Sequence, residues 1–577
     1  MAAGGQGRPP MTYGQAEQYF NSLEGPTAQE RIDFIFSSII PLLPAPVVPA
    51  PEAAGDDSDN ERCSLTSSES EASDAGADPP ALHPAALGDG GDHISRLPDV
   101  LLSNIVSRLT TKEAARTVVL STRWRGVWAA TPLLVDDAHL VGAHGPNDIP
   151  IVRAVSRCVA AHPGPVHGVR VTGVSFYSHE YALRCLVADL ADKDVQDLIL
   201  FNRPWPLNMP LPDDILRCAS LERLYLGVWD LPKITSLLPL CHQERCRIPV
   251  VQELQAALGG RRNGVVRGNL PPFRRVKDCK ITAARPAALN NLRELGLFHC
   301  IVRDEALDAL LAHCPKLQVL SIVMSYGSPS RLRIVSRSLK IAVDWKSSFD
   351  EVVVQDAPCL ERLILQTIYK RRPIKIVGAP RLEVLGFLDL NLHELEIGGI
   401  AIKAGMNVRA RATVPSLKIL AVTVQFARNQ EAKMVPTLLK CFPRLEALHV
   451  RAIPSEFVNS AHDLEFWESL GSCGCLEAHL KTLMVHGCLV QKNEIGFLQY
   501  IIREGKALKA VGLDPSLKNM VAIDLVLSSF ERDAASGGVS SGDIFDARVN
   551  GSLIFQNAID LTLDNPFCVD DALVSCF

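Results

Sequence analysis

Cysteine and histidine are the side chains in this sequence that could bind a metal ion or act as a nucleophile and its base. The 16 cysteines are scattered singly along 577 residues, without a CxxC pair, and the closest two are Cys473 and Cys475. A zinc site needs ligands about two to four residues apart in two groups. His313 and Cys314 are adjacent, but they directly precede a repeat unit of the kind that buries a cysteine. We therefore expect no metal and no cysteine nucleophile.

A search for enzyme motifs leads to the same expectation. The sequence contains no GxxxxGK[ST] phosphate loop and no HExxH metal motif. His299, His449 and His486 lie within or beside repeat units, where histidines commonly have structural roles. We expect a protein that is not an enzyme and has no cofactor.

The stretch LSTRWRGVW, residues 120–128, could instead stack on nucleic acid, because it places two tryptophans beside arginines. Two observations oppose that interpretation. The net charge is −5, which offers no general attraction to polyanions. Trp124 and Trp128 are also four residues apart, so they extend the apolar face of a helix. We favour a helix that packs against protein and disfavour nucleic acid.

Three short helices are predicted around these tryptophans, in residues 92–138. Pro98 suits the start of the first helix, and Thr110 with Glu113 forms a capping box for the second. Ser121 can cap the third. A unit this small leaves apolar side chains that need a partner or a neighbouring domain.

Beyond residue 190 the sequence repeats the phrase Leu-x-x-Leu-x-apolar, often preceded by proline. Clear copies include LERLYL (221–226), PCLERLIL (358–365), PRLEALHV (443–450) and LKAVGL (508–513), and SLKIAV (338–343) is a weaker copy. Several copies are separated by 21 to 28 residues and others by 35. One repeat cannot cover its own apolar face, so the copies must stack. We predict an α/β solenoid of parallel strands with outer helices and loops over 139–515.

The ends and one insertion differ from the repeats. Residues 1–91 are expected to be largely disordered, with one short helix at 27–40 and an acidic, serine-rich run at 52–74 that is either a solvated linker or a phosphorylation site. The basic insertion at 241–280 is either a surface loop, which we favour, or a contact for an anionic partner such as RNA. Residues 516–577 have no assignment.

The segment ISRLPDVLLSNIVSRLTTKEAARTVVLSTRWRGVW closely resembles the F-box of plant F-box proteins, and the repeats resemble the second half of plant F-box/leucine-rich-repeat proteins. Residues 476–513 look like the FBD region that often closes such chains. The resemblance implies that the protein is the substrate-recognition subunit of an SCF-type ubiquitin ligase. Its F-box would dock on a Skp-type adaptor, and through it a cullin, while the solenoid binds an unknown target protein. The alternative is a non-catalytic leucine-rich-repeat scaffold without a degradation role.

The resemblance also implies which residues bind the adaptor, although the sequence alone does not separate contact from core. They are Leu97, Pro98, Leu101, Leu102, Ile105, Leu109, Ala115, Val118, Val119, Leu120, Trp124 and Trp128. For the solenoid, outward positions between the leucines predict a surface of mixed charge for a protein partner. They include Glu222, Arg223, Tyr225, Arg293, Glu294, Gln318, Glu361, Arg362, Glu383, Lys418 and Glu446. The sequence has no secretory signal or membrane helix, so we expect a soluble protein of the nucleus and/or cytoplasm.

Overall fold

The computed structural model describes residues 36–37, 40, 43, 94–138, 148–177, 179–203, 209–231, 289–327, 331–366, 371–453, 464–488, 491–515 and 563–567. The insertion predicted at 241–280, the acidic run at 52–74 and most of the helix predicted at 27–40 lie outside the described residues. Among the helices that are described, none combines the length and the apolar character needed to cross a membrane.

A small helical unit precedes the sheet, as predicted. It contains η3 (Ile94–Arg96), α3 (Asp99–Ser107), α4 (Thr111–Arg116), η4 (Thr117–Val119) and α5 (Thr122–Ala130). The capping box is present: the Thr110 side chain accepts a hydrogen bond from the Glu113 amide, and the Glu113 carboxylate accepts one from the Thr110 amide. Ser121 stands at the N-cap of α5, but its side chain makes no capping hydrogen bond.

The main sheet has 13 strands among the described residues, and each neighbouring pair is parallel. All copies of the repeated phrase form strands of this sheet, which confirms the predicted solenoid of parallel strands. In spatial order the strands are β1 (Leu133–Asp136), β2 (Val166–Val171), β3 (Asp197–Phe201), β4 (Arg223–Gly227), β5 (Glu294–Phe298), β6 (Val319–Val323), β8 (Ile341–Trp345), β10 (Arg362–Gln366), β12 (Val384–Asp389), β15 (Ile419–Val424), β16 (Ala447–Ala452), β17 (Thr482–Cys488) and β18 (Ala510–Pro515).

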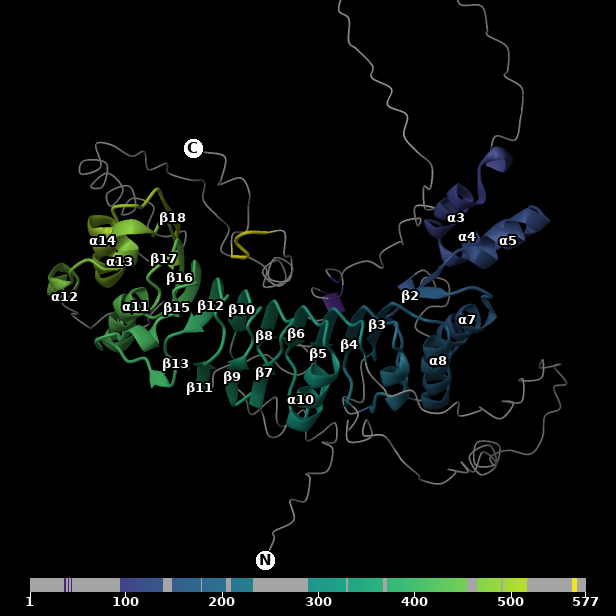
Figure 1. Cartoon of the computed structure of the whole chain (residues 1–577), viewed down its shortest axis with the longest axis horizontal. Coiled ribbons are helices and arrows are strands. Elements are labelled where there is room, and N and C mark those ends of the chain that lie inside the picture. Colours follow the sequence, from purple (N-terminus) through teal and green to yellow (C-terminus); the bar gives the residue numbers. More distant parts are fainter. Residues whose placement is uncertain are drawn as a thin grey trace, which may run out of the picture.

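The sheet starts earlier than the repeated phrase does. β1 lies inside the segment predicted as the helical unit, and β1 to β3 lack the leucine phrase. The helices join the sheet directly, because the Thr111 hydroxyl in α4 donates a hydrogen bond to the Leu134 carbonyl in β1 at 2.6 Å. Figure 1 shows α3, α4 and α5 at the end of the solenoid next to β2, and α12 (Leu464–Ser469), α13 (Gly474–Ala478) and α14 (Lys492–Glu504) at the other end.

The outer layer changes along the solenoid. Helices cover the sheet near its ends, whereas a second, five-stranded sheet covers its middle. The remaining helical elements are α7 (Asp148–Ala161), α8 (Glu180–Asp192), η5 (Asp213–Arg217), α10 (Asp304–His313), η7 (Ala410–Ala412) and α11 (Asn429–Cys441). The outer strands are β7 (Arg331–Val335), β9 (Glu351–Asp356), β11 (Arg372–Ile376), β13 (His393–Ile397) and β14 (Ile400–Ala401).

The outer layer thus contains strands besides the predicted helices and loops, and repeat length explains three of them, β7, β9 and β11. The strands β6, β8, β10 and β12 are joined by the shortest repeats among the described strands, because the register partners in turn are Val319, Ile341, Arg362 and Val384. A strand advances about 3.3 Å per residue and a helix only about 1.5 Å. A short repeat can therefore return across the width of the sheet only as a strand.

Side chains just beyond the strands tie successive repeats together. The Trp229 indole donates to the Leu200 carbonyl at 2.9 Å, and Cys300 Sγ donates to the Leu226 carbonyl at 3.5 Å. The hydroxyls of Ser325 and Ser347 donate in the same way to the carbonyls of Leu297 and Ile322, at 3.1 and 3.2 Å. Each hydrogen bond reaches back one repeat. The ladder therefore satisfies buried polar groups and fixes the stacking of the repeats.

Candidate protein-docking site

The core of the helical unit contains two of the residues predicted to contact the adaptor. Leu102 is 0% exposed and Trp124 is 8% exposed, and both pack with Val106, Ala114 and Val127. The sequence analysis did not separate contact from core, and in this structure these two residues belong to the core, because α3, α4 and α5 close over them. Their role is to hold the three helices together.

Other predicted residues lie on the surface. Leu101 is 48% exposed, Ile105 41% and Leu109 37%, and their spacing places them on one face of α3 and its C-terminal end. Val119 is 83% exposed at the end of η4. The others predicted as contacts divide in two: Pro98, Ala115 and Leu120 are exposed, whereas Leu97, Val118 and Trp128 are half-buried.

The structure adds two exposed apolar residues that the sequence analysis missed, Ile94 and Val100. Val100 directly precedes Leu101, so the apolar run Val100–Leu102 was the available signal. Helix α3 therefore carries apolar side chains on two faces, one in the core and one exposed. Apolar side chains grouped in this way mark a surface for a protein partner.

Arg123 fixes the start of α3 against α5. Its guanidinium donates to the Asp99 carboxylate, with Nε 2.7 Å from Oδ1, and also to the Leu97 carbonyl. The Trp128 ring meets the His162 ring edge-on at 4.7 Å between centroids, and Trp128 packs on both the helical core and the solenoid core. Neither tryptophan is free to stack on bases. The segment is thus the junction between the helical unit and the sheet.

The main sheet has a second apolar face, opposite its leucine core, which curves inward in Figure 1. We call this surface the concave face. It carries one apolar cluster made mainly of alternate strand residues, with Met324 just after β6: Ile199, Phe201, Tyr225, Phe298, Val319, Val323, Met324, Ile341, Val343, Trp345, Ile364, Val384, Phe387 and Ala421. The concave face is therefore largely apolar in its middle.

Seven of the eleven residues predicted to form a mixed-charge surface lie outside the strands and so outside the concave face. These residues directly precede their strands and form a row along the N-terminal ends of the strands. They are Glu222, Arg293, Gln318, Glu361, Glu383, Lys418 and Glu446. They form ion pairs along this row, such as Lys418 with Glu383 at 2.9 Å. Of the four predicted residues within strands, Arg223 pairs with Asp197 and the Tyr225 hydroxyl donates to Glu294 at 2.7 Å. Arg362 is 6% exposed.

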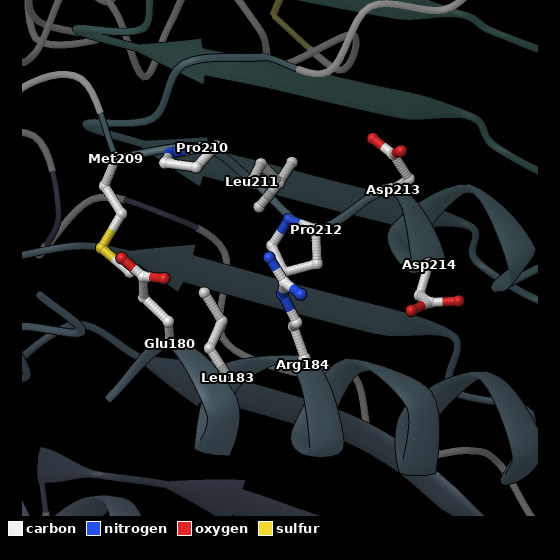
Figure 2. A pocket seen from close by; sticks show the side chains of 9 residues that line it. All are labelled: Glu180, Leu183, Arg184, Met209, Pro210, Leu211, Pro212, Asp213 and Asp214. Carbon is white, nitrogen blue, oxygen red and sulfur yellow. The ribbon is translucent and has the colours of Figure 1, made fainter. Parts of the chain in front are cut away.

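A small open cavity of about 380 Å³ lies between α8 and residues 209–214. Figure 2 shows Glu180 beside Met209 and Arg184 reaching from α8 toward Pro212, with Leu183 between the two α8 side chains. The pKa of Asp213 is raised, mainly by burial and then by Asp214. Among the described residues that line the cavity, none is a nucleophile with a base, and the charged side chains are one cation and three carboxylates. It offers no catalytic arrangement.

No three His, Cys, Asp or Glu side chains within the described ranges are grouped as a metal site would require. Cys473 and Cys475 come close, with 3.4 Å between their sulfur atoms, and Cys475 is buried. Within the described residues, the two candidate docking surfaces are the exposed apolar side of the helical unit and the concave face.

Three family models match this chain. The model of the F-box domain matches residues 94–135, and the model of the FBD matches residues 468–513. A model of the leucine-rich repeats of FBD-associated F-box protein At5g56370 matches residues 183–255 and 273–450.

Relatives in Arabidopsis thaliana agree with the family models. F-box/FBD/LRR-repeat protein At1g13570 is 22% identical over 453 residues, which are 76% of this chain and 95% of the relative. F-box protein At1g60400 is 27% identical over 168 residues, or 27% of this chain and 39% of the relative. F-box/FBD/LRR-repeat protein At5g22700 is 54% identical over 48 residues, 8% of this chain and 11% of the relative.

Proposed function

Because the chain belongs to the F-box proteins with leucine-rich repeats and an FBD region, we propose that it is a substrate-recognition subunit of an SCF-type ubiquitin ligase. F-box domains generally bind Skp-type adaptors. In this proposal the F-box docks on such an adaptor, and through it on a cullin, in the nucleus and/or cytoplasm. The solenoid binds a target protein.

The observation that carries the proposal is the exposed apolar surface of the F-box. Leu101, Ile105 and Leu109 on the α3 side and Val119 with Leu120 after α4 are exposed in the chain alone. Fully burying one such side chain is worth about 1.5–3 kcal/mol relative to leaving it exposed. Burying several of them at an interface is enough to overcome the cost of association. We assign the adaptor contact to these five residues, with Leu97, Pro98, Ala115 and Val118 at its margin.

The chain needs no catalytic residue for this role. A ligase subunit acts by holding its target near the reactive centre of another subunit, which raises the local concentration of the target. The F-box and the solenoid share a junction, since Trp128 packs on both cores. A target on the solenoid is thereby held at a defined position relative to the adaptor.

The proposal is tested by measuring the binding of a purified Skp-type adaptor to the whole chain. We expect the double variant Leu101→Glu/Val119→Glu to lose binding while its circular dichroism and melting temperature stay those of the wild type. A folded wild-type chain that does not bind the adaptor would overturn the proposal and favour a scaffold role.

A further inference from the structure

Two parts of the chain that are far apart in the sequence lie on the concave face. Figure 1 shows the short purple segment near residue 40 beside β4 and the short yellow segment, residues 563–567, above β10 and β12. Ile40, Leu43 and Phe567 are all buried in the apolar cluster of the concave face. The concave face is thus occupied by the chain itself at two positions.

Residues 563–567, which we call the tail segment, are held by one aromatic side chain. Phe567 is 3% exposed, and its ring centroid lies 4.9 Å from that of Phe387 and 5.5 Å from that of His449. The Arg451 guanidinium covers the Phe387 ring at 4.2 Å. A ring enclosed in this way is the kind of anchor that dominates the energy of peptide recognition.

Polar contacts fix the direction of the tail segment. Asn565 Oδ1 accepts a hydrogen bond from the Phe567 amide at 3.1 Å, so the other end of the side-chain amide, Nδ2, is the donor that faces His449 Nε2 at 3.0 Å. His449 is fully buried, and burial lowers its pKa to about 3, so the ring is neutral and can accept. The Arg362 guanidinium donates to the Leu563 carbonyl.

The tail segment contacts the sheet as a ligand would. It forms no strand and pairs with no strand of the main sheet. It follows β18 in the sequence, yet its contacts are with β10, β12 and β16, three strands in the interior of the sheet order. The contacts described are one ring, one side-chain amide and one carbonyl. Any peptide with the same groups at the same spacing can make them.

Building on the proposed ligase function, we propose that the concave face at β10–β16 is the target-docking surface and that the tail segment is its internal ligand. The target is a protein with an extended segment that carries an asparagine two residues before an aromatic side chain. It binds by replacing Asn565 and Phe567 at His449 and Phe387. Wild-type chain therefore binds such a target only in competition with its own tail.

The test uses a fluorescent peptide of residues 561–570 with Cys568→Ser, titrated into the full-length chain and followed by anisotropy. We expect the Phe567→Ala chain to bind the peptide at least about tenfold more tightly than wild type, because a tethered segment competes at about millimolar effective concentration. The matched control is Phe36→Ala. Phe36 packs on Phe201 of β3, outside β10–β16, with 6.1 Å between the ring centroids, so this chain should bind the peptide as wild type does.

Further variants test the contacts that Asn565 and Phe567 make with the sheet. The same peptide with both Asn565→Ala and Phe567→Ala should not bind, and His449→Leu in the Phe567→Ala chain should abolish binding. If the Phe567→Ala chain melts at a lower temperature than wild type, the Asn565→Ala chain serves as a second variant with a weakened tail contact. We expect the same gain in its affinity for the peptide. The inference would be overturned if a stable Phe567→Ala or Asn565→Ala chain bound no peptide, or bound the doubly substituted peptide equally well.

Adaptor binding is measured on the same samples. A chain that binds the peptide but not the adaptor counts against the ligase proposal and is consistent with the docking proposal. A chain that binds the adaptor but not the peptide counts against the docking proposal alone.

Discussion

Two adjacent leucines of α3 should respond to the same substitution in opposite ways. Leu101 is 48% exposed and Leu102 is 0% exposed. Leu102→Ala removes buried carbon from the core of a small helical unit, which costs about 2–5 kcal/mol in free energy of unfolding. Leu101→Ala removes surface carbon, so the free energy of unfolding should change by less than about 0.5 kcal/mol. Its loss should appear in adaptor affinity, at about 2 kcal/mol, or about 30-fold in Kd.

The assay has two parts. Hydrogen exchange of the α3, α4 and α5 amides reports the local stability of the F-box, and calorimetric titration with a Skp-type adaptor reports affinity. We expect Leu102→Ala to raise exchange in all three helices and Leu101→Ala to leave exchange unchanged while weakening binding. Unchanged affinity for Leu101→Ala would refute the assignment of the α3 surface, and increased exchange in that variant would refute the separation of contact from core.

Three further predictions concern the solenoid and its junction. Trp128→Ala should lower the free energy of unfolding by about 2 kcal/mol and raise hydrogen exchange in α5 and at His162, because the ring joins two cores. Unchanged hydrogen exchange would argue against the junction. Arg372→Ala should lower the free energy of unfolding in urea by about 3–5 kcal/mol, because it leaves the Asp344 carboxylate as an unpaired buried charge; the side chain of Asp344 is 0% exposed. The double variant Arg372→Leu with Asp344→Leu should recover most of this loss. The pKa of His393 is lowered to about 3, mainly by burial, so below about pH 6.5 the unfolded chain takes up a proton that the folded chain does not. Stability should therefore fall by about 2 kcal/mol between pH 7 and pH 5 through this residue, and His393→Gln should reduce the slope of unfolding free energy against pH.

The sequence by itself determined the elements whose signal is local. The alternation of leucines in each repeated phrase specifies a strand with one buried face, and the repetition requires the strands to stack. The pairing of Thr110 with Glu113 marked the start of α4 correctly, because a capping box involves residues three positions apart. These features need no knowledge of distant parts of the chain.

Burial on α3 and on the concave face depended on the tertiary structure. Leu101 and Leu102 are the same residue type side by side, and only the packing of α5 against α3 decides which one is enclosed. The apolar character of the concave face was hidden because charged residues such as Glu383 and Lys418 precede their strands, and the register places them at the N-terminal ends of the strands.

The seat of the tail segment is the furthest from any sequence pattern. Phe567 meets Phe387 and His449 across a large separation in the chain, and no periodicity relates these three residues. Local patterns report which backbone conformation a segment prefers. Contacts between distant segments depend on the curvature and register of the whole sheet, so only the assembled structure decides them.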